Sequence, residues 1–482
     1  MSKTSFSPDN LPAALERFIA ENPGYDAAEI DRLRASDYAR LDAAGHTYLD
    51  YTGGGLYAES QLAAHHGLLG GGVYGNPHSH NPTSLAATEL VERARNAVHE
   101  FFNADPAVYD VVFTANASGA LKLVGESFPF ETGSTYLIAY DNHNSVNGIR
   151  EFARARGADV VYFPVSPGDL RLDSELVAHH LDCECTGAAR LFAYPAQSNF
   201  SGVQHPLEWV AAARERGWRV LLDSAAFAPT NRLDLAAVEP DFVPLSFYKM
   251  FGYPTGIGAL IARREALAEL RRPWFAGGTI TLASVQGEGW YHLAPGHTGF
   301  EDGTVDYLGL PAVTIGLEHI SRIGIDNLHA RVEALAGWLL GRMRELTHSN
   351  GAPMVRVFGP DTMDRRGSTI AFYLLDPTGA VYDVYRVEQL AGEQLISVRT
   401  GCFCNPGDGE VAHAITREDM ESCFSEVQVP VTLGECQRII EDATGKVPNT
   451  IRISLGVASD FADVWRFMAF AEGLRDKAAG EI

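Results

Sequence analysis

The sequence predicts an α/β fold, in which a large domain with a mostly parallel seven-stranded sheet is followed by a smaller C-terminal α/β domain. Short apolar runs alternate with amphipathic helical runs through the middle of the chain, which is the rhythm of βαβ units. The 482 residues are 46% hydrophobic, enough for a large core and more than one domain. After about residue 305 this rhythm gives way to long helical stretches and more widely spaced strands.

The first 45 residues are polar and helical in pattern, and we expect them to form an arm before a large domain over residues 46–305. The first long helix of that domain covers 85–102, with a cap at Thr83 and Ser84. Helical patterns such as 206–216 separate most of the strands that follow, so we expect helices on both faces of the sheet. The strand-like runs are 108–113, 135–140, 160–165, 191–194, 220–223, 242–245 and 259–262.

Residues 306–482 are expected to hold two connecting helices and the small domain. The helices cover 308–323 and 325–346, and a helix over 461–477 closes the domain. The strands of the small domain are expected at 355–358, 368–375, 396–399 and 451–455.

Composition argues against several kinds of partner. The formal net charge is −23, and the Lys and Arg residues are scattered, so neither nucleic acid nor an anionic membrane surface is expected as a partner. The N-terminus has no apolar signal segment, and no run approaches the roughly 18 apolar residues of a membrane-spanning helix. Six cysteines form no disulfide framework in a chain of this length, so the expected location is cytoplasmic.

Lys249 is the most informative residue. It lies in DFVPLSFYKMFGYPTGIG, after an apolar strand and before a Gly/Pro-rich turn. Loss of hydration in such a place lowers the pKa of a lysine and favours the neutral amine that bonds to an aldehyde. The preceding strand delivers Asp223 at its carboxyl end, where open α/β sheets bind ligands. Pyridoxal 5'-phosphate (PLP) requires such a pair, because the carboxylate keeps its pyridine nitrogen protonated and the lysine holds its aldehyde.

Three further segments are candidates for the same site. The segment FTANASGA, residues 113–120, is either an ordinary helix cap or a cradle for the cofactor phosphate at a helix N-terminus. His143 follows another strand and is either a loop histidine or an imidazole over the pyridine ring. Arg452 interrupts the apolar strand IRISLG and is either solvent-facing or a clamp on a substrate carboxylate.

The loop RTGCFCNPGDG places Cys402 and Cys404 on a Gly/Pro-rich segment, whereas structural cysteines favour buried strands. A metal site would need Cys423 and His413, whose spacing fits no standard zinc pattern, so no metal is expected. A redox pair is the other alternative. A second Cys-x-Cys, at 183–185, has no chemistry around it.

With these motifs in place, the sequence resembles the class V aminotransferase branch of the fold-type I PLP-dependent transferases. Within that branch it resembles the cysteine desulfurases, and among these the PLP-dependent N-terminal domain of molybdenum cofactor sulfurases. The resemblance runs from about residue 48 to 470. It rests on YLDYTGGGLY at 48–57, YGNPHSHN at 74–81, FTANASGALKLV at 113–124, YPAQSNFSGV at 194–203, LLDSAA at 221–226, DFVPLSFYKMFGYPTGIGAL at 241–260, FEDGT at 300–304, VRTGCFCNPG at 398–407 and IRISLG at 451–456.

The resemblance implies a role for each candidate residue in binding the cofactor. Lys249 bonds to the aldehyde, Asp223 pairs with the pyridine nitrogen and His143 stacks on the ring. Thr304 reaches the phosphate of a neighbouring subunit, which implies a homodimer. The remaining cofactor-binding residues are Asn199 near the ring hydroxyl, and Ser118, Ser246 and the Ala117 backbone at the phosphate.

The resemblance also assigns the substrate groups and marks two departures. Arg452 binds the substrate carboxylate, and Cys404 rather than Cys402 aligns with the desulfurase nucleophile. Tyr248 replaces the histidine that desulfurases usually have before the lysine, as in the sulfurases. Ala226 replaces a common glutamine, so one hydrogen bond to the ring oxygen is missing. The sequence ends soon after the helix that closes the small domain, so the further cofactor-binding domain of the sulfurases is not expected.

The implied reaction is desulfuration of L-cysteine or a cysteine-like amino acid, which gives alanine and a Cys404 persulfide for an unidentified sulfur acceptor. The alternative is a PLP-dependent C–S β-lyase, epimerase or other class V activity without a persulfide, for which Cys404 is incidental. A third reading is a non-catalytic protein of the same fold. The joint presence of Lys249, Asp223, His143 and Arg452 argues against it.

Overall fold

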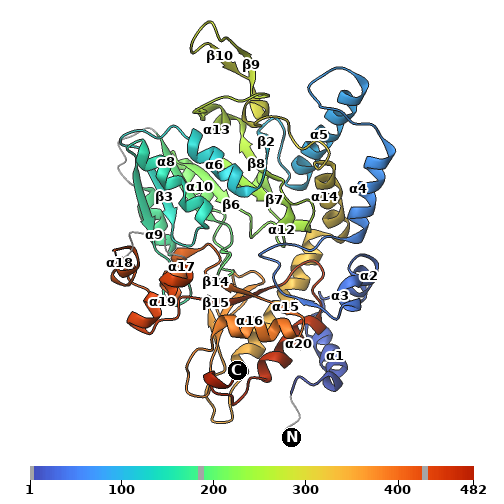
Figure 1. Ribbon diagram of the computed structural model, residues 1–482, viewed down its shortest axis with the longest axis vertical. Coiled ribbons are helices and arrows are strands. Elements are labelled where there is room, and N and C mark those ends of the chain that lie inside the picture. The colour runs from blue at the N-terminus through green and yellow to red at the C-terminus, as the bar shows by residue number, and fades with distance from the viewer. Residues whose placement is uncertain (1–4, 183–188, 426–432) are drawn as a thin grey trace.

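The computed structural model describes residues 5–182, 189–425 and 433–482. Its large domain is built on a seven-stranded sheet of order β2-β8-β7-β6-β5-β3-β4 (Figure 1). Strand β8 runs antiparallel to β2 and β7, and the other neighbouring pairs are parallel. The predicted sheet is therefore confirmed. Its strands are β2 (Tyr109–Thr114), β3 (Thr135–Ala139), β4 (Asp159–Phe163), β5 (Arg190–Pro195), β6 (Arg219–Asp223), β7 (Phe242–Ser246) and β8 (Gly258–Arg263).

Both faces of this sheet are buried, because successive strand residues alternate between two hydrophobic cores. In β2, Val112 packs into the core that includes α6, whereas Val111 and Phe113 pack into the other core. Helices on both sides complete a three-layered domain. They are α4 (Glu59–Gly71), α5 (Pro82–Phe101), α6 (Ala117–Ser127), α7 (Asn144–Asn147), α8 (Ile149–Ala155), α9 (Ser174–Leu181), α10 (Trp209–Glu215), α11 (Leu235–Val238), α12 (Phe247–Phe251) and α13 (Arg264–Glu269).

The small domain lies below the large one in Figure 1 and holds a four-stranded antiparallel sheet of order β11-β12-β15-β14. Its strands are β11 (Val355–Phe358), β12 (Thr369–Leu374), β14 (Arg399–Gly401) and β15 (Thr450–Ser454). Helices α14 (Pro311–Ile323) and α15 (Ile325–Glu345) lead into it, as predicted. Its other helices are α16 (Val384–Glu393), α17 (Pro406–Ala412), α18 (Arg417–Ser425), α19 (Leu433–Thr444) and α20 (Phe461–Glu472).

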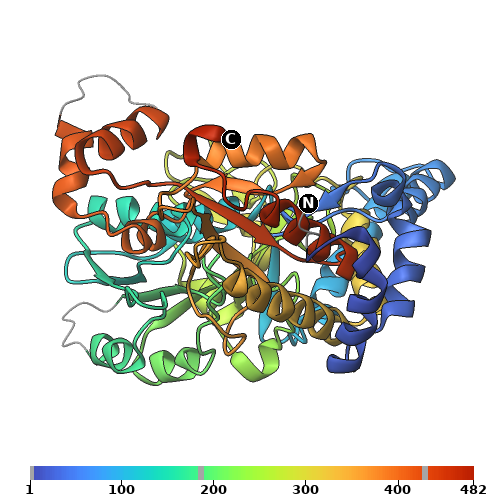
Figure 2. The same cartoon turned by 90° about the horizontal axis from the view of Figure 1, so that it is seen from below.

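The N-terminal segment forms α1 (Leu11–Glu21), α2 (Ala27–Asp37) and α3 (Ala39–Ala43), and it contacts both domains, α1 through α20 and α2 through α4. Helix α1 lies beside α20 (Figure 2), where the ring of Phe18 stacks on Phe461 with 4.6 Å between centroids. Arg34 of α2 is buried and pairs with Asp463 at 2.7 Å and with Asp42 at 2.6 Å. The expected division at residues 45 and 305 stays a prediction.

Several predicted boundaries differ from those in the structure, and two have clear causes, one local and one distant. Helix α5 begins at Pro82 because Asn81, not Thr83 or Ser84, caps it: the Asn81 side chain accepts a hydrogen bond from the Ser84 N–H at 3.0 Å. The strand expected at 396–399 is divided between two sheets. Strand β13 (Ile396–Ser397) pairs with β1 (Thr47–Tyr48), whereas β14 pairs with β15.

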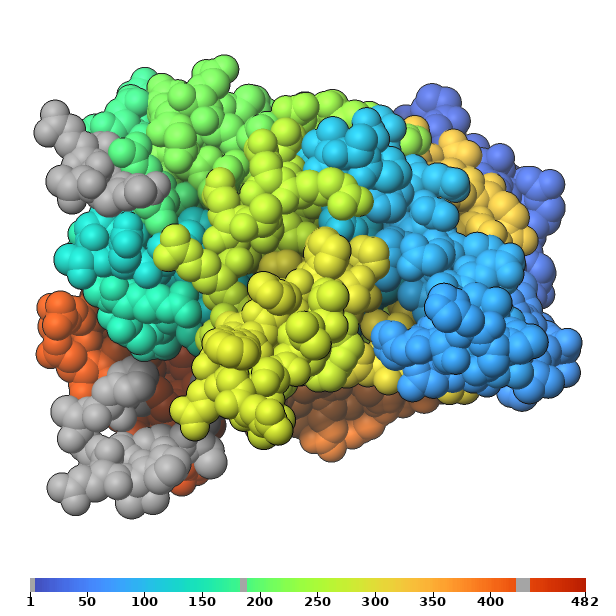
Figure 3. Space-filling model, turned by 90° about the horizontal axis from the view of Figure 1, so that it is seen from above, coloured from blue at the N-terminus to red at the C-terminus, as the bar shows by residue number. Residues whose placement is uncertain are grey.

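A two-stranded hairpin, β9 (Ile280–Ala283) and β10 (Tyr291–Leu293), projects from the top of the large domain (Figure 1). The segment around it spreads over the upper face of the molecule (Figure 3). It exposes Leu282, Val285 and Trp290, and Trp274 and Phe275 beside it are exposed as well. In the described ranges, no helix is both long and apolar enough to cross a membrane.

Candidate active site

A cavity of about 200 Å³ lies where the strands of the large sheet end. The carboxyl ends of β3, β5, β6 and β7 share one edge of the sheet because these strands are parallel. The cavity therefore collects side chains from segments far apart in the sequence. Seven of the predicted site residues line it: Lys249, Asp223, His143, Asn199, Ala117, Ser118 and Ser246.

Lys249 reaches the cavity from α12, the short helix that follows β7. Burial lowers its pKa, and the negative charge of Asp223 acts in the opposite direction. The lysine side chain is thus shielded from bulk water but accessible from the cavity. These are the conditions predicted from the sequence for an amine that bonds to an aldehyde.

Asp223 and His143 flank the same cavity. Asp223 ends β6 and accepts a hydrogen bond from the Ala225 N–H at 3.0 Å. Burial lowers the pKa of His143, which Asp223 partly offsets, so the imidazole is mostly neutral at neutral pH. The Ser145 N–H donates to His143 Nδ1 at 3.1 Å, which places the ring proton of the neutral imidazole on Nε2.

The N-terminus of α6 forms another wall of the cavity. Asn116 caps this helix, and its side chain accepts from the Gly119 N–H at 2.9 Å. The Ala117 N–H donates to Ser246 Oγ at 3.1 Å, and the hydroxyls of Ser118 and Ser145 are 2.6 Å apart. A helix N-terminus attracts anions, and hydroxyl groups beside it can donate further hydrogen bonds to them.

This donor set fits PLP. The cofactor carries an aldehyde, a basic ring nitrogen and a phosphate, and the cavity offers an amine at Lys249, a carboxylate at Asp223 and the hydroxyl-rich end of α6. These three kinds of group belong to one cavity, so one small molecule can engage all of them.

Arg452 is not solvent-facing, because only 2% of its surface is exposed. On β15, its Nη1 donates to the Asn199 backbone oxygen at 2.8 Å, and its Nη2 pairs with Asp50 at 3.1 Å. The ring of Phe403 covers its guanidinium at 4.4 Å, and Nε has no partner among the described residues. Burial lowers the pKa of Arg452 to about 10, although Asp50 opposes the shift. Arg452 does not line the cavity but lies behind Asn199, close enough to affect the pKa of Lys249.

The two loop cysteines lie in different surroundings. Cys404 is exposed, and its backbone oxygen accepts from the Asn144 N–H at 2.7 Å, next to His143 in the cavity wall. Cys402 is half-buried, and its charge adds to the effect of burial in raising the pKa of Tyr385 on α16. The structure thus ties the Cys404 backbone to the cavity wall, although the Cys404 side chain does not line the cavity.

The backbone of this loop is strained. Phe403 and Cys404 have φ values of 56° and 55°, a left-handed conformation that costs non-glycine residues about 1–2 kcal/mol each. The strain is held by hydrogen bonds: Asn199 Nδ2 donates to the Phe403 oxygen and the Asn144 N–H to the Cys404 oxygen, both at 2.7 Å.

Thr304 does not line this cavity. Its side chain is exposed, and its hydroxyl accepts a hydrogen bond from Asn76 at 3.3 Å. Its expected role toward a neighbouring subunit stays a prediction. Among the described residues, no group of three His, Cys, Asp or Glu side chains could hold a metal ion, and His413 instead bonds Tyr373 and Thr450. The Cys-x-Cys at 183–185 and the side chain of Cys423 lie outside the described part.

Sequence reasoning missed several residues around the site. Asp50 accepts from both Arg452 and Arg399, which donates at 2.8 Å through Nε and at 2.5 Å through Nη2. Ser145 and Gln197 line the cavity. Asp50 and Gln197 lie in the motifs YLDYTGGGLY and YPAQSNFSGV, which were the available signal. Which member of a motif points inward depends on long-range packing that the motif does not encode.

Comparison with known sequences places this geometry in a family. A sequence profile described as Aminotransferase class-V matches residues 47–467. Molybdenum cofactor sulfurase from Solanum lycopersicum is 34% identical over 499 residues, an alignment that covers 96% of this chain and 60% of that protein. The chain thus spans less than two thirds of the length of this relative.

Solved structures share the fold. Cysteine desulfurase from Thermococcus onnurineus superposes with a TM-score of 0.74 at 22% identity, covering 93% of this chain and 98% of that one. The cystine C–S lyase C-DES, in complex with its product cysteine persulfide, superposes with a TM-score of 0.67 at 20% identity, covering 89% and 98%. The predicted fold-type I architecture is confirmed.

Proposed function

Because this chain belongs to the aminotransferase class V family, we propose that it is a PLP-dependent enzyme that removes sulfur from L-cysteine or a similar amino acid. The similarity to molybdenum cofactor sulfurase and to a cysteine desulfurase supports this reaction. The amine, carboxylate and anion-binding helix end of the cavity support the cofactor.

When bound, PLP withdraws electrons from the α-carbon of an amino acid joined to it, which weakens the bonds at that carbon. Asp223 would keep the ring nitrogen protonated, and the α6 N-terminus with Ser118 and Ser246 would hold the phosphate. Lys249 would hold the aldehyde until the substrate amine replaces it, and its neutral amine could then accept the α-proton.

Arg452 and Cys404 would act on the amino acid itself. The guanidinium of Arg452 is already fixed by Asp50 and the Asn199 backbone, so it can bind a carboxylate with little loss of side-chain freedom. The Cys404 thiolate would attack the substrate sulfur: an S–S bond forms, the C–S bond breaks, and its electron pair stays on the carbon. That carbon takes up a proton to give alanine, and Cys404 becomes a persulfide.

The observation that carries this proposal is the attachment of the cysteine loop to the cavity wall: the Cys404 oxygen accepts from the Asn144 N–H at 2.7 Å, next to His143, in the wall of the cavity that contains Lys249. The test is to incubate the PLP-loaded protein with L-cysteine and to analyse small products and intact protein by mass spectrometry. We expect alanine and an added sulfur on Cys404. Pyruvate with free sulfide and no protein-bound sulfur would instead indicate a C–S lyase, the activity named for the similar structure C-DES.

A homodimer is the second part of the proposal. The β9–β10 hairpin exposes Val285 and Trp290, at 98% and 73% of their surfaces. Such an apolar face favours burial against a second copy. Exposed Thr304 lies close by, since the Gly303 N–H donates to the Gly277 oxygen at 2.8 Å. Sedimentation is expected to give a dimer, and a fully active PLP-saturated monomer would contradict the role of Thr304.

We also propose that the sulfur passes to an acceptor outside this chain, because exposed Cys404 is accessible from solvent. A cytoplasmic location remains part of the proposal, on the low cysteine content alone.

A further inference from the structure

The residue after Cys404 is completely buried and binds the wall of the cavity. Asn405 caps α17, accepting from the Asp408 N–H at 3.2 Å. Its Nδ2 donates to the Asp141 backbone oxygen at 2.9 Å and to Asn199 Oδ1 at 3.1 Å. An amide nitrogen has two hydrogens, so these two short bonds are its main ones, and Ser198 Oγ and Asp408 Oδ2 lie further away at 3.4 Å. The acceptors of the two short bonds belong to residues that line the cavity.

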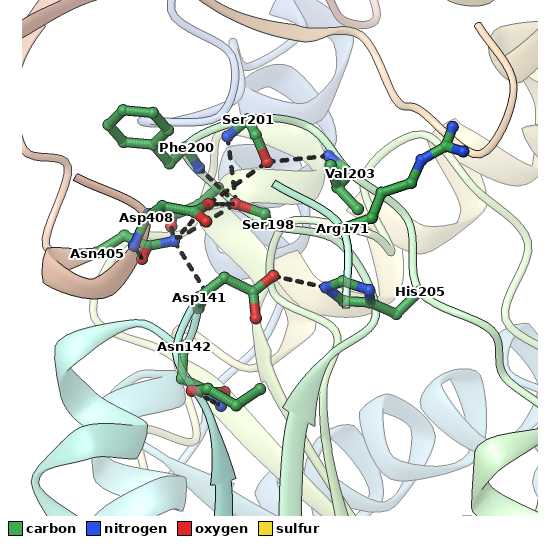
Figure 4. Close-up of polar contacts among 12 residues, drawn as sticks. Asp141, Asn142, Arg171, Ser198, Phe200, Ser201, Val203, His205, Asn405 and Asp408 are labelled. Atoms are coloured by element: carbon green, nitrogen blue, oxygen red, sulfur yellow. Dashed lines mark hydrogen bonds and ion pairs between the residues drawn. The ribbon is translucent and has the colours of Figure 1, made fainter. Parts of the chain in front are cut away.

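Asp408, one turn further along α17, binds the same wall. Its Oδ2 accepts from Ser198 Oγ at 2.5 Å and from Ser201 Oγ at 3.4 Å, and its side chain is fully buried. Ser198 Oγ in turn accepts the N–H groups of Phe200 and Ser201. Figure 4 shows Ser198, Ser201, Asn405 and Asp408 pointing toward one another beside Asp141. We call these four residues the loop clamp.

The loop clamp joins two parts of the molecule. Ser198 and Ser201 follow β5 of the large domain, whereas Asn405 and Asp408 belong to the small domain and directly follow Cys404. Asn199, between the two serines, lines the cavity and donates to the Phe403 oxygen. The strained backbone at Cys404 therefore lies between fixed points on either side.

We propose that Asn405 and Asp408, which do not line the cavity, are positioning residues that hold the Cys404 thiol in place for sulfur transfer. The inference rests on the proposed persulfide chemistry and names residues that this chemistry needs. Substrate binding is assigned to Arg452, Asp223 and Lys249. The side chains of Asn405 and Asp408 make no hydrogen bond to any of these three residues. Loss of the clamp should therefore slow transfer to Cys404 and spare amino-acid binding.

The protonation state of the Asp408 carboxyl suggests a second, conservative variant for the test. Oδ1 has no partner among the described residues, and the groups around Oδ2 are neutral hydroxyls and an amide. Burial, with the Asp141 carboxylate adding to it, raises the pKa of Asp408 well above its usual range. Asparagine offers the same acceptor without the charge, so Asp408→Asn should preserve the clamp and Asp408→Ala should break it.

The experiment compares Asp408→Ala, Asp408→Asn and Asn405→Ser in the PLP-loaded protein. Serine caps a helix but is too short to reach Asp141 and Asn199, so Asn405→Ser removes the clamp and keeps the cap. Asp173→Ala is the matched control, because Asp173 caps the remote helix α9 with bonds of 2.7 and 3.1 Å. We expect Asp173→Ala to form the persulfide at the wild-type rate.

We expect persulfide formation on Cys404 to fall about 100-fold in Asp408→Ala and Asn405→Ser, as for a misplaced reacting group. The affinity for L-alanine, read from the cofactor absorbance, should stay within about twofold of the wild type. Hydrogen exchange of the peptide 402–412 should be faster in both variants, with or without cofactor, and unchanged in Asp408→Asn and Asp173→Ala.

Wild-type rates of persulfide formation in both clamp variants would overturn the inference, as would an equal loss of L-alanine affinity. If Asp408→Ala does not fold, Asn405→Ser alone decides. A wild-type protein that forms no persulfide would refute the proposed function instead, and in that case the exchange data still show whether the clamp holds the loop.

Discussion

Replacing each loop cysteine by alanine separates catalytic loss from structural loss. Cys404 is exposed, so its truncation removes almost no buried surface, and we expect the free energy of unfolding to change by less than about 0.5 kcal/mol. Cys402 is half-buried, so the same change should cost up to about 1 kcal/mol. Alanine tolerates the left-handed φ of residue 404 no better and no worse than cysteine does.

The effect on activity should run the other way. Cys404→Ala should abolish persulfide formation from L-cysteine, a loss of at least about 10³-fold or 4 kcal/mol at the transition state, while the cofactor absorbance still changes on binding L-cysteine. Cys402→Ala should keep most of the activity. The assay measures alanine, sulfide and protein-bound sulfur, with urea denaturation of both variants as the control for folding. Full sulfide release by Cys404→Ala, or a persulfide mapped to Cys402 in the wild type, would refute the reasoning.

Three other outcomes are expected. Asp223→Asn should keep the fold but lose at least about 100-fold in turnover, or roughly 3 kcal/mol, because an amide cannot keep the ring nitrogen protonated; near-normal steady-state rates would contradict this. Burial lowers the pKa of Lys249, and its amine is neutral only above that pKa. When PLP is added to the apo-protein and trapped on Lys249 with borohydride, the yield should therefore rise with pH. It should reach half its maximum below the ordinary lysine pKa of 10.5. Peptide mapping that finds the label on another lysine would remove the basis of the site. Arg34→Ala leaves buried Asp463 without its 2.7 Å partner and should lower the free energy of unfolding, measured by urea denaturation, by about 3–5 kcal/mol. Arg32 is exposed on the same helix, so Arg32→Ala should lower it little. Equal effects of the two substitutions would show that the buried pair does not matter.

The large sheet and much of the site could be predicted because both depend on local patterns. Alternation of apolar strands and amphipathic helices indicated the order of the elements; Asp223 ends one such strand, and Lys249 lies on the short helix that follows the next. Strand ends of a parallel sheet meet at one edge, so these two residues could be brought together without knowledge of the packing.

What could not be predicted depends on contacts between distant segments. Asp50 binds Arg452 across 402 positions of sequence, and no periodicity indicates that pair. The strand expected at 396–399 divides because its first half pairs with residues near the N-terminus. The early start of helix α5 is instead a local effect: Asn81, Thr83 and Ser84 are all suitable caps, and the structure uses Asn81.

The small sheet carries both groups that are proposed to act on the amino acid. Arg452 lies on β15, and the cysteine loop leaves the neighbouring strand β14, where Arg399 pairs directly with Arg452 and Gly401 with Thr450. The large domain nevertheless holds each group separately, because the Asn199 oxygen accepts from Arg452 Nη1 at 2.8 Å and the Asn144 N–H donates to the Cys404 oxygen at 2.7 Å. A displacement of the small sheet relative to the large one would break both bonds, so the separation of guanidinium and thiol depends on the contact between the two domains.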